Sequence, residues 1–184
     1  MPRIAFDQLP DSSRVWVFAS DRPLKGAEAE VLLEEVDRFL EEWKAHGSPL
    51  QCAREWRDDR FLAIGVDPTE EQASGCSIDG LFRGLQALER RLATGLVAGG
   101  RVFYRDAKGQ PQLALRGEVP VLYSRNVLSD DTQVFDTSLT DASAWRQRFV
   151  RPAHDTWVAS LFGPPQASQS SSRSATKSSS VRNG

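Results

Sequence analysis

Cysteine is scarce in this chain, and long hydrophobic runs are absent. Its 184 residues include two cysteines, Cys52 and Cys76, which are too few for a disulfide framework and wrongly spaced for a zinc ribbon. No apolar run approaches the roughly 20 residues that span a bilayer, and the first residues lack the apolar segment of a secretory signal. We therefore expect a cytoplasmic protein with reduced thiols and no membrane partner.

Histidine is equally scarce. The two histidines, His46 and His154, and the two cysteines have no spacing that presets a metal site. The chain also has no Gly-Lys dipeptide, so it lacks a phosphate-binding P-loop, in which glycines precede Lys and then Ser or Thr. We expect neither a metal nor another cofactor, and P-loop ATPase chemistry is excluded.

Charge of one sign is not in excess. The sequence has 23 basic and 25 acidic residues, which gives a formal net charge of −2. Residues 164–184 hold three basic side chains and no acidic one, so removing these three charges from the net −2 leaves −5 on the preceding residues. A negative folded part argues against a partner with a phosphate backbone, so we expect no nucleic-acid binding by this part.

The sequence divides into a globular part and a serine-rich tail. Residues 164–184 contain no aromatic side chain, and Val181 is their only large apolar one. Such a segment cannot bury enough apolar surface to offset the entropy lost on ordering, so we predict that 164–184 are disordered. Residues 1–163 are expected to form a single globular α+β domain.

Hydrophobic periodicity in residues 1–163 predicts alternating strands and helices. Continuous or alternating apolar runs favour strands, and apolar positions three and four residues apart favour helices. The expected elements are, in order, a strand at 14–18, a helix at 27–46, strands at 50–56 and 61–66 joined by a turn at Asp58-Asp59, a helix at 78–94 and a strand at 101–105.

This order, strand-helix-strand-strand-helix-strand, is typical of the ferredoxin-like fold. We therefore predict a four-stranded antiparallel sheet with both helices on one face. The most apolar runs, 14–18 and 61–66, should be its central strands, because edge strands tolerate the charged side chains found in 50–56 and 101–105. A C-terminal extension of short strands and helices should cover the sheet.

A polar hexapeptide, Ser74-Gly75-Cys76-Ser77-Ile78-Asp79, lies where the loop after the strand 61–66 becomes the second helix. The first N–H groups of a helix have no partner within it and, beside hydroxyls, can hold an anion or a polar ligand. In the expected fold the two central strands end at one edge of the sheet, where Asp67 and Arg22 would meet the hexapeptide. We therefore predict a small ligand-binding or interaction module, with the candidate ligand-binding residues Arg22, Ser74, Gly75, Cys76, Ser77 and Asp79.

Cys76 supports an alternative function. Thiols at helix N-termini are often reactive, so Cys76 is a candidate catalytic residue of a thiol-dependent enzyme or redox protein. In the expected fold His46 lies at the opposite end of the helix layer from Cys76. His154, in the C-terminal extension, is then the one histidine that could act as a base.

The same residues also have purely structural interpretations. Cys76 can be buried as a small apolar residue while Ser74 or Ser77 caps the second helix. A carboxylate in the first turn, such as Asp79, complements the helix dipole. Arg22 can form an internal ion pair with Asp67 or Asp79, which would leave no free charge for a ligand.

Further distinctive segments are Val15–Phe18, Asp21-Arg22, residues 45–50, Val134–Asp136 and Asp155–Trp157. With the hexapeptide they resemble a family of small bacterial proteins that carry the Ser-Gly-Cys-Ser-Ile-Asp motif and are often labelled ABC transporter ATPases. The resemblance covers nearly all of residues 6–162 and implies no established activity. Because the P-loop is missing, the label does not describe the chemistry of this chain.

Overall fold

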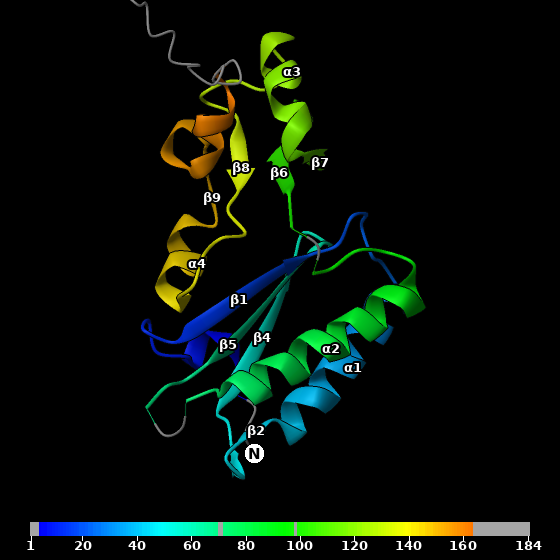
Figure 1. Cartoon of the computed structure of the whole chain (residues 1–184), viewed down its shortest axis with the longest axis vertical. Coiled ribbons are helices and arrows are strands. Elements are labelled where there is room, and N and C mark those ends of the chain that lie inside the picture. The colour runs from blue at the N-terminus through cyan, green and yellow to red at the C-terminus, as the bar shows by residue number, and fades with distance from the viewer. Residues whose placement is uncertain (1–3, 70–71, 98, 164–184) are drawn as a thin grey trace, which may run out of the picture.

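Three strands from the first part of the chain form an antiparallel sheet in the computed structural model, which describes residues 4–69, 72–97 and 99–163 (Figure 1). Its strands are β1 (Arg14–Ala19), β5 (Phe61–Val66) and β4 (Cys52–Arg57), in the order β1-β5-β4. Asp58 and Asp59, both with positive φ, make the tight turn between β4 and β5, as the sequence predicted.

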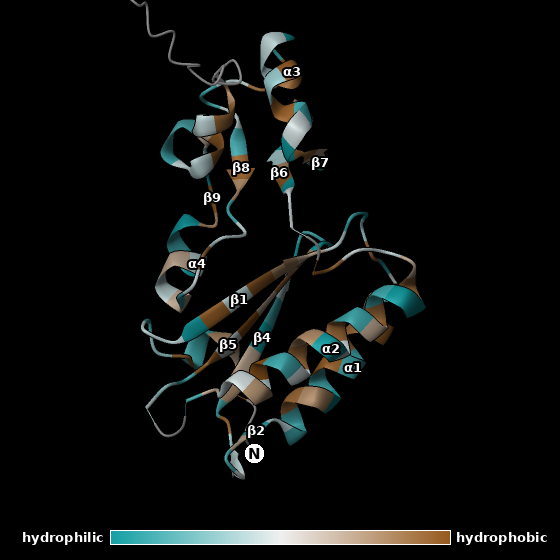
Figure 2. Cartoon of the chain, in the orientation of Figure 1, coloured by the Kyte–Doolittle hydropathy of each residue, from teal (hydrophilic) through white to brown (hydrophobic). Residues whose placement is uncertain are grey.

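Two long helices, α1 (Ala27–Glu42) and α2 (Gly75–Leu92), cover one face of this sheet (Figure 1). Their buried apolar residues form one cluster with those of β1, β4 and β5. Hydrophobic and hydrophilic residues alternate along both helices (Figure 2). The helices are antiparallel. Trp43, directly after α1, donates its Nε1–H to the Ser77 carbonyl at the start of α2 (2.9 Å), and Arg22, ahead of α1, reaches the Leu92 carbonyl at the end of α2 (2.8 Å).

The first helix ends four residues earlier than predicted. A small hairpin replaces its last turn, with strands β2 (Lys44–Ala45) and β3 (Ser48–Pro49). The turn between them places His46 and Gly47 at positive φ, a conformation that a right-handed helix does not contain.

The second half of the chain forms a separate four-stranded sheet in the order β7-β6-β8-β9. These strands are β6 (Arg101–Arg105), β7 (Pro111–Leu115), β8 (Gln133–Phe135) and β9 (Val150–Pro152). The short helices are α3 (Val119–Ser124), α4 (Ala142–Arg148) and the 3₁₀ turns η1 (Phe6–Gln8), η2 (Arg116–Glu118), η3 (Ala153–Asp155) and η4 (Trp157–Leu161).

An aromatic cluster joins the two sheets. Phe61, the first residue of β5, is fully buried and stacks on Phe135 of β8, with a distance of 4.5 Å between ring centroids. Phe103 of β6 and Phe149 beside α4 contact the same ring edge-on, at 5.3 and 5.1 Å. The face of the first sheet opposite α1 and α2 is thus covered by α4 and by the second sheet.

The α+β class is confirmed, whereas the ferredoxin-like arrangement is not. The strand expected as the fourth of the sheet, β6, pairs with β7 and β8 instead. The prediction that residues 14–18 form a central strand is also wrong, because β1 lies at an edge and runs antiparallel to β5. Both faces of β1 are covered, and its apolar character reflects that burial rather than a central position in the sheet.

The predicted tail, 164–184, lies outside the described residues. Within the part of the chain that the structure describes, no helix has the length and apolar character needed to cross a membrane.

Candidate functional site

The hexapeptide forms the start of α2, as predicted. Ser74 is the N-cap residue, and its Oγ accepts a hydrogen bond from the Ser77 N–H at 3.3 Å. The Ser77 hydroxyl in turn donates to the Ser74 carbonyl at 2.8 Å. Ser74 therefore caps the helix, as its structural interpretation allowed, and the Ser77 hydroxyl is used in a local hydrogen bond.

The other polar side chains of the hexapeptide face solvent. Gly75, Cys76 and Asp79 are exposed, so the expectation that Cys76 is buried is wrong. None of the six hexapeptide residues lines the cleft that is described below. The start of α2 thus presents an open surface.

Arg22 is not part of this surface. It forms two hydrogen bonds to the Glu28 carboxylate, at 2.5 and 2.7 Å, and a third to the Leu92 carbonyl at the far end of α2. Since α2 has 18 residues, these two ends are about 27 Å apart at ~1.5 Å per residue. The hydrogen bond from Arg22 also holds the pKa of the Glu28 carboxyl below its usual range. Arg22 does pair internally, as the structural interpretation allowed, although its partner is Glu28.

The predicted convergence of strand ends fails for a topological reason. In the antiparallel register Ala19 lies opposite Phe61 and Arg14 opposite Val66, so the end of β1 is beside the beginning of β5. Asp21 and Arg22 therefore lie at one end of the sheet, and Asp67 and the hexapeptide lie at the other.

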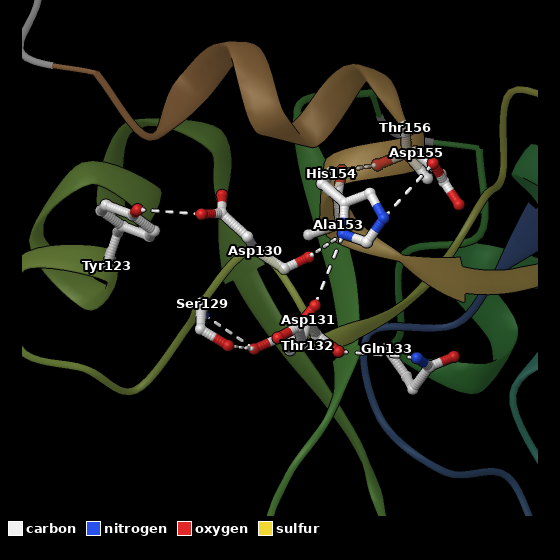
Figure 3. A network of polar contacts seen from close by, with 10 residues as sticks. All are labelled: Tyr123, Ser129, Asp130, Asp131, Thr132, Gln133, Ala153, His154, Asp155 and Thr156. Atoms are coloured by element: carbon white, nitrogen blue, oxygen red, sulfur yellow. Dashed lines mark hydrogen bonds and ion pairs between the residues drawn. The ribbon is translucent and has the colours of Figure 1, made fainter.

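The two histidines are placed differently from the prediction as well. Because α1 and α2 are antiparallel, His46 follows the end of α1 on the same side as the start of α2, where β2 contacts α2. His154 belongs to η3, beside the second sheet and remote from the start of α2 (Figure 1). Its Nδ1 lies 3.0 Å from the Asp130 carbonyl, and its two ring nitrogens lie 3.6 and 3.4 Å from Asp131 and Asp155 (Figure 3). His154 is therefore not a base for Cys76.

We expect one of the two thiols to react in the folded protein. Cys76 is exposed, whereas Cys52 is fully buried and its Sγ–H points to the Leu40 carbonyl at 3.4 Å. Maleimide labelling followed by mass spectrometry should add one label to the native protein and two in denaturant. In the control Cys76→Ser the native protein should take up none, and a label on that variant would contradict the burial of Cys52.

A cleft lies between the two sheets, away from the start of α2. This cleft has a volume of about 570 Å³ and runs along the outer edge of β1. The loop before β6 closes one side of it, and the loop of residues 137–140 closes the other. A cleft of this size is in the usual range for small-molecule sites.

The cleft has a positive lining. Arg14 and Arg116 lie on its wall, and each guanidinium stacks on a tryptophan that also lines the cleft: Arg14 on Trp16 at 4.6 Å and Arg116 on Trp157 at 5.5 Å. Among the described residues of the lining there is no acidic side chain. The third arginine of the lining, Arg101, is buried and forms an ion pair with Asp21, which does not line the cleft.

Polar groups on the edge of β1 add hydrogen-bonding capacity. The Val15 N–H donates to the Thr140 carbonyl at 2.8 Å, and the Ala19 N–H donates to the Leu96 carbonyl at 3.3 Å. Alternation along the strand directs the N–H of Val17, midway between them, to the same outer edge. Val17 lines the cleft, as do the hydroxyl residues Thr137, Ser138 and Thr140.

Sequence reasoning missed this cleft. Its two exposed arginines are separated by about a hundred positions, and no local motif connects them. The one usable signal was the spacing of Arg14 and Trp16, since residues two apart on a strand share a face.

Comparisons with protein-family models, with curated proteins and with solved structures find no match for this chain. The functional assignment therefore rests on the geometry of the cleft.

Proposed function

We propose that the protein is a small binding module that holds an organic anion in the cleft between its two sheets. The observation that carries this proposal is the pair of exposed guanidiniums, Arg14 and Arg116, in a cleft whose described lining contains no acidic residue. A carboxylate or phosphate group is the natural partner of such guanidiniums, because it accepts two parallel N–H bonds from one arginine.

The apolar lining indicates what the rest of the ligand is like. Trp16, Phe82 and Trp157 line the same cleft as the arginines. A ring or an apolar chain can pack on these side chains while the anionic group contacts a guanidinium. We therefore propose a ligand with an aromatic or apolar body and at least one negative charge.

The lining favours binding over catalysis. The described residues that line the cleft include no histidine, cysteine, aspartate, glutamate or lysine, the side chains that most often act as general bases. The Ser138 hydroxyl donates to Asp136 at 2.5 Å, and the same carboxylate already pairs with Arg151 at 2.8 Å. We further propose a cytoplasmic location, where the two cysteines, which form no disulfide, would stay reduced.

A thermal-shift comparison of three probes tests the proposal. Phenyl phosphate and benzoate carry the expected anion and ring, and benzyl alcohol is a neutral control of similar size. A ligand that binds the folded state raises the melting temperature with concentration. We expect the two anions to do so and added salt to weaken the effect. Equal stabilisation by benzyl alcohol, or none by either anion at millimolar concentration, would contradict anion binding.

Two observations favour the thiol-dependent alternative: Cys76 is exposed, and His46 lies on the same side of the helical layer as the start of α2. The alternative predicts that native Cys76 reacts with maleimide faster than the same thiol in the denatured chain. Equal or slower labelling removes this alternative, because an exposed thiol without activation is an ordinary surface residue.

A further inference from the structure

Arg60 is a buried arginine whose Nε has no partner among the described residues. It lies at the turn before β5, where its backbone carbonyl accepts the Ser20 N–H at 2.9 Å. The residue is 6% exposed, and its buried Nε has no hydrogen-bond acceptor among the residues that the structure describes. Burial lowers the pKa of this guanidinium, while the charge of Asp21 acts in the opposite direction.

Arg60 lies beside a residue that lines the cleft. Its Cζ lies 5.9 Å from the centroid of the Phe103 ring, and the Cζ of Arg101 lies 5.7 Å from the same centroid. Arg101 and Phe103 both line the cleft. Arg60 is therefore next to the inner wall of the proposed binding site.

The charges at this wall do not balance. Asp21 is the carboxylate that pairs with Arg101, and it also accepts the Gly95 N–H at 3.0 Å. One carboxylate thus faces two guanidiniums, so Asp21, whose charge acts on Arg60 as well as on Arg101, offsets one of two positive charges. A buried charge that is only partly compensated is unfavourable, and an apolar residue of similar length can be more stable in such a place.

We propose that Arg60 is a binding residue for a phosphate monoester, whose phosphoryl group lies against Arg101 and Phe103 at the inner end of the cleft. This inference rests on the proposed function and adds the class of anion. Arg14 and Arg116 line the cleft, and Arg60 lies next to its wall without lining it. None of the three is within ion-pair distance of a carboxylate in the described part of the chain. A phosphate monoester carries a charge of about −1.5 to −2 at neutral pH, which matches such a site better than a monoanion does.

Two variants of Arg60 give a sharp test, with dissociation constants measured by calorimetry at pH 7.5. Arg60→Met removes the charge and keeps the length of the side chain. We expect it to raise the melting temperature without ligand and to weaken phenyl phosphate binding about 10- to 100-fold. Arg60→Lys keeps the charge and should bind between the parent and Arg60→Met.

A second comparison tests the class of anion. Phenyl sulfate has the same ring and a similar tetrahedral group, but it carries a single charge. We expect the parent protein to prefer phenyl phosphate to phenyl sulfate, and we expect the preference to disappear in Arg60→Met. Equal binding of both probes by the parent would overturn the assignment to a phosphate monoester.

The outcomes separate this inference from the proposed function. If Arg60→Met and Arg60→Lys both bind phenyl phosphate like the parent, while variants of Arg14 and Arg116 do not, Arg60 is structural and the cleft remains the site. A lower melting temperature of Arg60→Met with unchanged affinity also makes Arg60 structural. If the parent protein binds neither phenyl phosphate nor benzoate, the proposed function and this inference are both wrong.

Discussion

Replacing Phe61 with alanine is expected to destabilise the protein by about 3–5 kcal/mol, the usual range for a fully buried phenylalanine. Its ring lies between Phe103, Phe135 and Phe149, which come from the second sheet and from the segment after α4. Removing the ring leaves a cavity where the two sheets meet, and three aromatic rings lose contacts at once. Urea denaturation measured by circular dichroism gives the change in the free energy of unfolding.

A matched control separates this effect from the general cost of removing a phenyl ring. Phe39 of α1 is half-buried, and its contacts are within the helical layer, including a tilted contact with Trp43 at 5.5 Å. Phe39→Ala should therefore cost clearly less than Phe61→Ala. A loss below about 1.5 kcal/mol for Phe61→Ala would show that the site is not tightly packed as described.

Reversing the charge of both exposed cleft arginines is expected to abolish anion binding. The double variant Arg14→Glu/Arg116→Glu removes two donors and places two carboxylates where the ligand's negative group approaches. Each lost charge-assisted hydrogen bond weakens binding about tenfold or more, and the like-charge repulsion adds to this. Calorimetric titration with phenyl phosphate should show at least a hundredfold loss, again about tenfold for each arginine.

The control for charge reversal is Arg125→Glu. Arg125 follows α3, is exposed, and does not line the cleft. The Arg125→Glu variant changes the net charge by the same amount as Arg14→Glu, so it reports the effect of overall charge alone. Binding that falls equally in Arg125→Glu and in the single variant Arg14→Glu would mean that the cleft arginines make no specific contact.

Local structure could be predicted from the sequence because its causes are local. The apolar face of α1, the turn at Asp58-Asp59 and the cap at Ser74 each depend on residues within a few positions of one another. The pairing of strands depends on contacts that are distant in the sequence. Phe61 of β5 stacks on Phe135 of β8, and the hydrophobic periodicity of the sequence does not predict that contact.

The error in topology caused the error in the predicted site. A parallel arrangement of residues 14–18 and 61–66 would have brought Arg22 to the hexapeptide, and the observed antiparallel register separates them. Because β6 pairs in the second sheet, β1 is an edge strand of the first, and its outer edge becomes a wall of the cleft. Arg14 and Arg116 come together only through the joining of two sheets, so no local motif in the sequence links them.

The most direct test of the cleft as the binding site follows the tryptophan indole N–H signals by NMR during a titration with phenyl phosphate. Trp157 lines the cleft, the indole of Trp43 donates to the Ser77 carbonyl in the hexapeptide, and that of Trp145 donates to Glu55 in the core at 2.7 Å. Each signal is assigned with a Trp→Phe variant. We expect a saturable shift that is largest at Trp157 and negligible at Trp145. A largest shift at Trp43, with Trp157 unchanged, would place the ligand at the start of α2 and contradict the account.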